Sequence, residues 1–175
     1  MDAADRQLIL KLLADSRAEL VSAAAGVSEE QSRIRPAPDS WSILDCVEHV
    51  AIVENFLYNS LTTGLTAAPS LADRSREEMF LRRAADRATK FSAPERARPT
   101  GRFPSLAAAV EKFQDNRART VEYVERCDKD LRSYSVPHPV LGPISGQEFL
   151  IVLVLHAARH AAQIREVRRA LSIPS

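Results

Sequence analysis

The chain has no strong excess of positive or negative charge, and this argues against binding partners that are themselves highly charged. Lysine and arginine number 24 against 23 aspartate and glutamate residues, so the net charge is +1. A near-neutral chain has no field of one sign to attract nucleic acid or an anionic membrane surface, and neither partner is expected. Acidic and basic residues alternate in the stretch 74–87 (RSREEMFLRRAADR), which is typical of a solvated helix face.

Long apolar runs and cysteine clusters are also missing. The longest apolar run, Phe149–Leu155, has seven residues, whereas a membrane-spanning helix needs about 20. The first 20 residues, MDAADRQLILKLLADSRAEL, lack the basic start and cleavage site of a secretory signal, so none is expected. Cys46 and Cys127 have neither metal-type nor redox-type spacing, and we expect both to be reduced and buried. These features together predict a cytoplasmic protein.

Helical periodicity dominates what the sequence does contain. Long helices are predicted over Ala4–Ala25, Ser42–Leu61, Ser105–Cys127 and Ser145–Leu171, and a charged helical region over Leu71–Lys90. Ser145 and Glu148 form a full capping box, and Ser42 with Asp45 is a variant of it, so each serine marks a helix start. Connections rich in proline and glycine separate the helices. No convincing strand alternation is evident.

These elements predict an all-α fold, a four-helix bundle that forms a single domain over residues 1–175. The connection before the third long helix is long enough to cross the end of the bundle. The helices therefore need not alternate simply up and down.

The last predicted helix carries two histidines, His156 and His160, in an otherwise apolar segment (LHAARHAAQI). Residues four apart lie on one helix face, about 6 Å apart along the axis, so both imidazoles can reach one ion. The pair could equally be buried, neutral and hydrogen-bonded. His49 lies on the flank of the 42–61 helix, beside apolar neighbours, while Glu48 projects to the side expected to face solvent. Burying a histidine without a partner costs about 1–3 kcal/mol, so a partner for His49 is expected.

A shared cation is the simplest such partner for histidines on facing helices of a bundle. Three neutral imidazoles suit Zn, Ni, Fe, Co or Mn, and three protein ligands leave positions open for water or substrate. The hypothesis is a divalent-metal site made by His49, His156 and His160, with chemistry at the open position.

Three motifs resemble the DinB-like superfamily: W-S-I-x-D-x-x-x-H in Trp41–His49, H-P-x-x-G-P in His138–Pro143 and H-x-x-R-H-x-x-Q-I in His156–Ile164. The resemblance implies a four-helix bundle that holds a divalent metal with three histidines, one in the second helix and two in the last. His49, His156 and His160 match these positions. The superfamily includes bacillithiol transferases and mycothiol-dependent maleylpyruvate isomerases.

The resemblance implies a metal-dependent enzyme for a small molecule, either a thiol S-transferase using a low-molecular-weight thiol or a hydrolase. A homodimer is a further implication. Two alternatives remain: a non-catalytic metal-binding or dimerising stress-response protein, and a structural bundle whose histidines bond one another. The catalytic residues are unknown, because no general base stands out. For Glu54 the sequence favours an inter-helix salt bridge over a general base, and for Arg159 a surface or dimer contact over a substrate contact.

For each of four further residues in or near the motifs, the sequence allows two possible roles. His138 is expected to be a loop residue held between prolines, with a ligand role as the alternative. Asp45 could orient His49 or serve the helix cap, and these roles nearly exclude each other. Cys46 is expected to be a buried thiol under Trp41 rather than a fourth ligand. Gln163 could reach the site or a backbone carbonyl.

Overall fold

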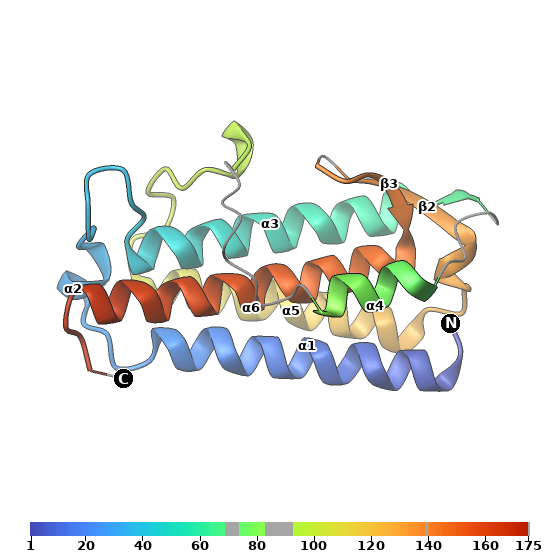
Figure 1. The fold of residues 1–175 in the computed structure, drawn as a ribbon, viewed down its shortest axis with the longest axis horizontal. Coiled ribbons are helices and arrows are strands. Elements are labelled where there is room, and N and C mark those ends of the chain that lie inside the picture. Colours follow the sequence, from blue (N-terminus) through green and yellow to red (C-terminus); the bar gives the residue numbers. More distant parts are fainter. Residues whose placement is uncertain (69–73, 83–92, 139, 175) are drawn as a thin grey trace.

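The protein is a helical bundle with a small sheet at one end (Figure 1), seen in a computed structural model that describes residues 1–68, 74–82, 93–138 and 140–174. The helices are α1 (Ala3–Ala24), α2 (Glu29–Arg33), α3 (Ile43–Thr63), α4 (Arg74–Arg82), α5 (Leu106–Arg126) and α6 (Gly146–Ala170). The strands are β1 (Thr66–Ala67), β2 (Tyr134–His138) and β3 (Gly142–Ser145), and short 3-10 turns are η2 (Glu95–Ala97) and η3 (Leu131–Ser133). The predicted all-α bundle is confirmed, with the sheet as an addition.

Serine caps begin the two helices that carry the histidines, as the sequence predicts. The Ser42 hydroxyl accepts from the Asp45 amide at 3.1 Å, and the Asp45 carboxylate accepts from the Ser42 amide at 3.0 Å. Ser145 and Glu148 make the same reciprocal pair at the start of α6, at 3.1 and 2.7 Å. A cap of this kind contributes about 1 kcal/mol and defines the helix start.

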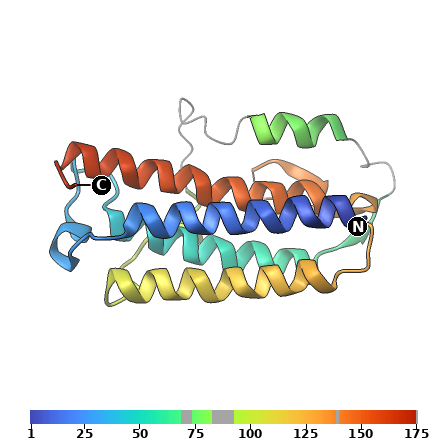
Figure 2. The same cartoon turned by 90° about the horizontal axis from the view of Figure 1, so that it is seen from below.

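The four long helices do not alternate up and down. One core cluster joins the end of α1 (Leu20), the start of α3 (Val47), the start of α5 (Phe113) and the end of α6 (Ile164). The other cluster joins the opposite ends of the same helices. Helix α1 therefore runs parallel to α6, and α3 runs parallel to α5, as Figure 2 shows. The connection between α3 and α5 therefore leads from one end of the bundle to the other. It is a long crossover, as the sequence predicts, but it runs along the bundle instead of across its end.

The sequence predicts no strands, and this prediction is wrong. An antiparallel sheet of order β1-β2-β3 closes one end of the bundle, with Val136 paired to Ile144 and Pro137 paired to Pro143. Val136 and Ile144 are both fully buried and join the core. The strands have two, five and four residues, too few for alternation to be recognised. Their prolines, which lack an amide donor, also argue against a strand in the sequence.

Helix α4 is held against the bundle by ion pairs. The Arg132 guanidinium donates to Glu77 of α4 at 2.7 Å and to Asp5 of α1 at 2.9 Å, and Arg76 lies 3.1 Å from Glu148 of α6. Phe80 and Leu81 of α4 also pack against the core, so ion pairs and apolar contacts together hold this strongly charged helix in place. The rest of the helical region predicted over 71–90 lies outside the described residues.

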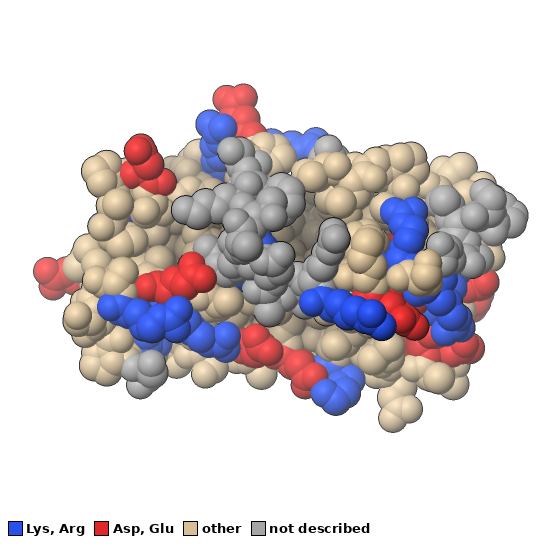
Figure 3. All heavy atoms as spheres, in the orientation of Figure 1, with Lys and Arg blue, Asp and Glu red and all other residues tan. Residues whose placement is uncertain are grey.

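Charged side chains of both signs are interspersed over the face seen in Figure 3. None of the described helices is long and apolar enough to cross a membrane.

A candidate metal centre

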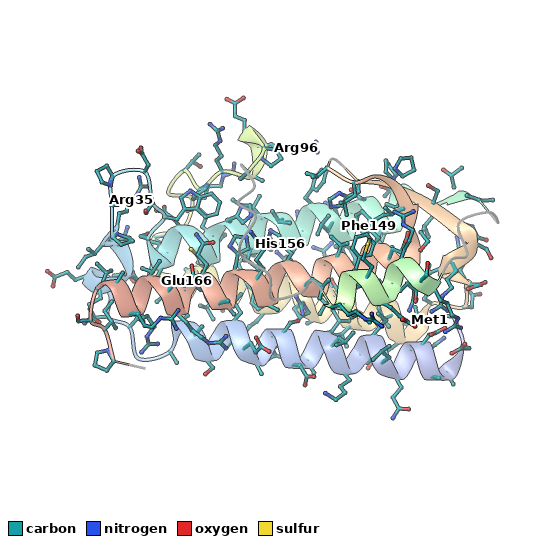
Figure 4. The ribbon with its side chains drawn as sticks, in the orientation of Figure 1. Met1, Arg35, Arg96, Phe149, His156 and Glu166 are labelled. Atoms are coloured by element: carbon teal, nitrogen blue, oxygen red, sulfur yellow. The ribbon has the colours of Figure 1, made fainter. Side chains whose placement is uncertain are left out.

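Three histidines from two helices meet inside the bundle. His49 comes from α3, while His156 and His160 come from successive turns of α6, which packs against α3. The ring centroids are 4.9 Å apart for His49 and His156, 4.7 Å for His49 and His160, and 4.6 Å for the α6 pair. Figure 4 shows His156 near the middle of the molecule, at the level where α3 and α6 lie alongside each other. The three histidines therefore lie close together, and their role as metal ligands stays a prediction.

The nitrogen positions fit a shared ion. Each histidine offers one ring nitrogen, and these atoms lie within 4.8 Å of one another. His49 Nε2 and His156 Nε2 are 3.0 Å apart. Two nitrogens about 2.1 Å from one divalent ion are about 3.0 Å apart at a right angle and about 3.4 Å apart at a tetrahedral angle. The observed distance matches adjacent coordination positions, and it also matches a hydrogen bond between the two rings.

The strap formed by residues 94–102 sets the orientation of His49. The Nδ1 atom of His49 lies 2.6 Å from the Ala97 carbonyl oxygen, at a buried position. A carbonyl oxygen only accepts, so Nδ1 carries the hydrogen and donates it. The lone pair of the neutral ring is then on Nε2, which faces the other two histidines. A fixed tautomer of this kind presents a metal ligand in the correct direction.

Trp41 covers one side of the histidine cluster. Its ring centroid lies 4.8 Å from that of His49, and it stacks at 6.0 Å on His160 with an angle of 17° between the planes. The position directly before the Ser42 cap places Trp41 there, because an apolar residue at this point packs back onto the first turns of the helix. The indole excludes water from this side and leaves any open coordination position elsewhere.

Burial favours the neutral forms of His49 and His156. Desolvation lowers the pKa of His49, partly opposed by its hydrogen bond to Ala97. Desolvation also lowers the pKa of His156 well below its ordinary value, and the nearby His160 and His49 lower it further. The neutral ring is the form that binds a metal ion, so the site needs little proton release to become a ligand set.

Two of the neighbouring residues have other roles. The Asp45 carboxylate is committed to the α3 cap and to an ion pair with Arg35 at 3.0 Å, so its predicted alternative role beside His49 is wrong. The Nδ1 atom of His138 accepts from the amides of Val140 and Leu141 at 3.2 and 3.1 Å, which stabilises the turn between β2 and β3. His138 is the last residue of β2, paired with Gly142 of β3, so the loop position expected from the sequence is wrong. It is not a member of the histidine cluster in the described part of the chain.

Glu54 forms the predicted inter-helix salt bridge, with its carboxylate 2.6 Å from Arg117 Nε of α5. Cys46 is fully buried, as expected. Within the described part of the chain, the cluster with metal-ligand spacing around His49 contains the three histidines and no thiol or carboxylate. The roles suggested for Gln163 and Arg159 stay predictions.

Sequence reasoning missed Glu48, which it placed on the solvent side of α3. The side chain is 1% exposed. Its carboxylate accepts from the Thr100 amide at 2.7 Å and from the Arg102 amide at 3.2 Å. Projection of a single helix could not detect this, because the strap that covers Glu48 lies about 50 residues further along the chain. The only local signal is the turn sequence Pro99–Arg102, which contains a glycine.

The fold and the site define a class of protein. It is a four-helix bundle with a three-histidine cluster between α3 and α6, which run in opposite directions. Residues 12–164 match the DinB superfamily, and the chain belongs to that superfamily. The match does not distinguish bacillithiol transferases or maleylpyruvate isomerases within it. YuaE of Bacillus subtilis (strain 168), described as uncharacterized, is 22% identical over 159 residues that cover 91% of this chain and 96% of YuaE.

Solved structures show the same fold. YfiT from Bacillus subtilis, described as a probable metal-dependent hydrolase with an unusual four-helix bundle topology, superimposes with a TM-score of 0.64 at 14% identity, over 99% of this chain and 91% of YfiT. A conserved protein from Enterococcus faecalis gives a TM-score of 0.67 at 16% identity, over 98% of each chain. At these identities the likeness extends to the fold alone.

Proposed function

We propose that His49, His156 and His160 hold a divalent metal ion and that the protein is a metal-dependent hydrolase of a small molecule. The observation that carries the proposal is the convergence of three ring nitrogens within 4.8 Å of one another. Neutral imidazoles suit Zn, Ni, Fe, Co or Mn, and three ligands leave room for water and substrate. The description of YfiT as a probable metal-dependent hydrolase supports the reaction type.

The contribution of the chain is to prepare the ligands and the space around them. A divalent ion at such a site supplies Lewis-acid activation of water or of a thiol. The Ala97 carbonyl holds His49 in the tautomer that directs Nε2 inward, and Trp41 shields the cluster from one side. Fixed ligands and excluded water reduce the reorganisation needed during reaction.

Thiol S-transfer to a small molecule is the alternative activity within the same site, supported by the superfamily resemblance. The two activities differ in the co-substrate. Protein loaded with Zn²⁺, Ni²⁺ or Co²⁺ is assayed on ester and amide panels with and without added low-molecular-weight thiols. Turnover without thiol supports the hydrolase, and turnover that requires thiol supports the transferase. The homodimer and the cytoplasmic location stay predictions.

A non-catalytic metal-binding protein is the second candidate. Among the described residues, no carboxylate or thiol joins the histidine cluster to act as a base, which favours binding without turnover. Metal-loaded protein that shows no turnover above free metal in any of these assays supports this candidate over the enzyme.

The metal site itself is tested by His156→Ala. His138→Ala is the matched control, because His138 ends strand β2 and is not part of the three-histidine cluster. Equilibrium dialysis with elemental analysis measures bound metal. We expect the His156 variant to lose tight binding and the His138 variant to keep it. Equal metal content in wild type and His156→Ala would remove the assignment. A structural bundle with mutually bonded histidines predicts no metal in any of the three proteins.

A further inference from the structure

The strap, residues 94–102, is attached to α3 at several points around the histidine cluster. The Ala97 carbonyl accepts from His49 Nδ1, and the amides of Thr100 and Arg102 donate to Glu48. The Arg96 guanidinium lies 4.1 Å from the centroid of the Phe56 ring, two turns further along α3. Figure 4 shows Arg96 on the part of the chain that lies over α3. The strap is thus held to α3 by hydrogen bonds with two neighbouring side chains, Glu48 and His49, and by the contact of Arg96 with Phe56.

Glu48 is an unusual group for a buried helix position. Its side chain is 1% exposed, and burying a carboxylate is costly unless hydrogen bonds compensate. Two strap amides supply that compensation, and charge-assisted hydrogen bonds are about twice as strong as neutral ones. Gly101, between the two donors, has a φ of +75°, a conformation that lets both amides point at one carboxylate and that side chains other than glycine rarely adopt.

Glu48 and His49 are adjacent on α3 and hold the same short strap. The hydrogen bonds from Thr100 and Arg102 fix the strap three to five residues beyond Ala97, so the position of the Ala97 carbonyl depends on them. If the strap leaves α3, His49 loses the acceptor that fixes its tautomer and ring angle. Glu48 does not touch the histidine cluster in this chain of contacts; it acts through the strap.

We propose that Glu48 is a positioning residue for the metal site, and that closure of the strap and occupation of the site by a divalent cation are thermodynamically linked. This inference rests on the proposed function. A metal ligated by His49 Nε2 favours the tautomer with hydrogen on Nδ1, which is the one that binds the Ala97 carbonyl. By reciprocity, the closed strap tightens metal binding by the same factor as metal tightens strap closure.

The test compares Glu48→Gln with Asp45→Asn. Glutamine keeps the shape of Glu48 but turns one acceptor into a donor facing a strap amide. Asp45→Asn is the matched control. The Asp45 carboxylate on α3 also accepts a hydrogen bond from a backbone amide, but this amide is that of Ser42, in the helix cap. Co²⁺ affinity is measured by quenching of Trp41, the single tryptophan, and by the visible spectrum of bound Co²⁺. Removal of a group that orients a ligand weakens metal affinity about 10–100-fold, and we expect this for Glu48→Gln alone.

Strap closure is measured separately by limited trypsin digestion with mass spectrometry. Trypsin can cleave after Arg96 and Arg102, whereas the bond after Arg98 precedes a proline and resists. We expect Co²⁺ to slow cleavage at both sites in the wild type. In Glu48→Gln, cleavage should be faster and the protection by Co²⁺ smaller, while Asp45→Asn should behave as wild type. Gly101→Val strains the same turn from the strap side and should have the same effects as Glu48→Gln. It replaces Glu48→Gln in the test if Glu48→Gln does not fold.

The outcomes separate the two proposals. A wild-type protein that binds no Co²⁺ would overturn the proposed metal site and this inference together. A wild-type protein that binds Co²⁺, with Glu48→Gln and Gly101→Val showing the same affinity, spectrum and metal protection, would overturn the inference and leave the metal site standing.

Discussion

The buried pair between Glu54 and Arg117 gives the sharpest energetic prediction. The two side chains are 2% and 1% exposed, and the guanidinium donates to both carboxylate oxygens, at 2.6 and 3.0 Å. Removing one partner of such a pair leaves a buried charge without compensation and costs about 3–5 kcal/mol. We therefore expect Glu54→Leu and Arg117→Met each to lower the free energy of unfolding by about that amount.

The double variant should be far more stable than the sum of the two changes. It has no charge left at positions 54 and 117. Its main remaining losses are the hydrogen bonds that Arg117 donates to the Leu13 carbonyl at 2.8 Å and to Ser16 at 2.7 Å. Such losses cost about 1–3 kcal/mol together. The single changes add to about 6–10 kcal/mol, so the coupling energy should be at least about 3 kcal/mol.

Urea unfolding followed by circular dichroism and by Trp41 fluorescence measures all four proteins. Additive single changes would refute the reasoning, because they would mean that neither charge depends on the other. The same variants test the role of Glu54 in function. A structural pair predicts that the double variant keeps its metal affinity, and a loss of metal binding in a folded double variant would contradict that role.

Three further predictions concern the site and the docking of α4. Saturating metal at about 100 times its dissociation constant should stabilise the wild type by about 2.7 kcal/mol and His160→Ala by almost nothing, measured by thermal unfolding; equal gains would contradict the ligand role. Ni²⁺ should quench Trp41 fluorescence in the wild type with the stoichiometry of binding, because the indole lies against two of the histidines; unchanged emission at full occupancy would contradict this. The Arg132 hydrogen bond lowers the pKa of Asp5 below its ordinary 3.8, so the stability that Asp5 contributes is present above that pH and is lost as the pH falls through the folded-state pKa. The difference in unfolding free energy between wild type and Asp5→Asn should shrink below about pH 3.8, and a constant difference would contradict the shift.

Much of the helical framework could be predicted from local rules. Serine caps and apolar periodicity depend on residues three or four apart, so Ser42 and Ser145 mark the starts of α3 and α6 in the sequence as they do in the structure. The sheet could not be predicted in this way. Its strands are short and contain Pro137 and Pro143, and they are stabilised by burying Val136 and Ile144 against helices far away in the sequence.

In the candidate site, too, local features could be predicted from the sequence and contacts with distant segments could not. His156 and His160 share a face because of helix geometry, and the position of His49 follows from the bundle and from the superfamily resemblance. The strap contacts His49 and Glu48 through backbone groups, and the pattern of side chains in the sequence does not show where this backbone lies. For this reason the sequence predicts a solvent-exposed Glu48, which is wrong. The Ala97 carbonyl is a backbone group without a sequence signature, so the sequence does not identify it as the partner of His49.

The central claim is that imidazoles from α3 and α6 share one cation. Anomalous diffraction at the absorption edge of cobalt, on crystals of the Co²⁺-loaded protein, tests it most directly. The account predicts a single strong peak per chain within bonding distance of His49 Nε2 and of one ring nitrogen each from His156 and His160. No peak between the three rings, with His49 and His156 hydrogen-bonded to each other instead, would contradict it.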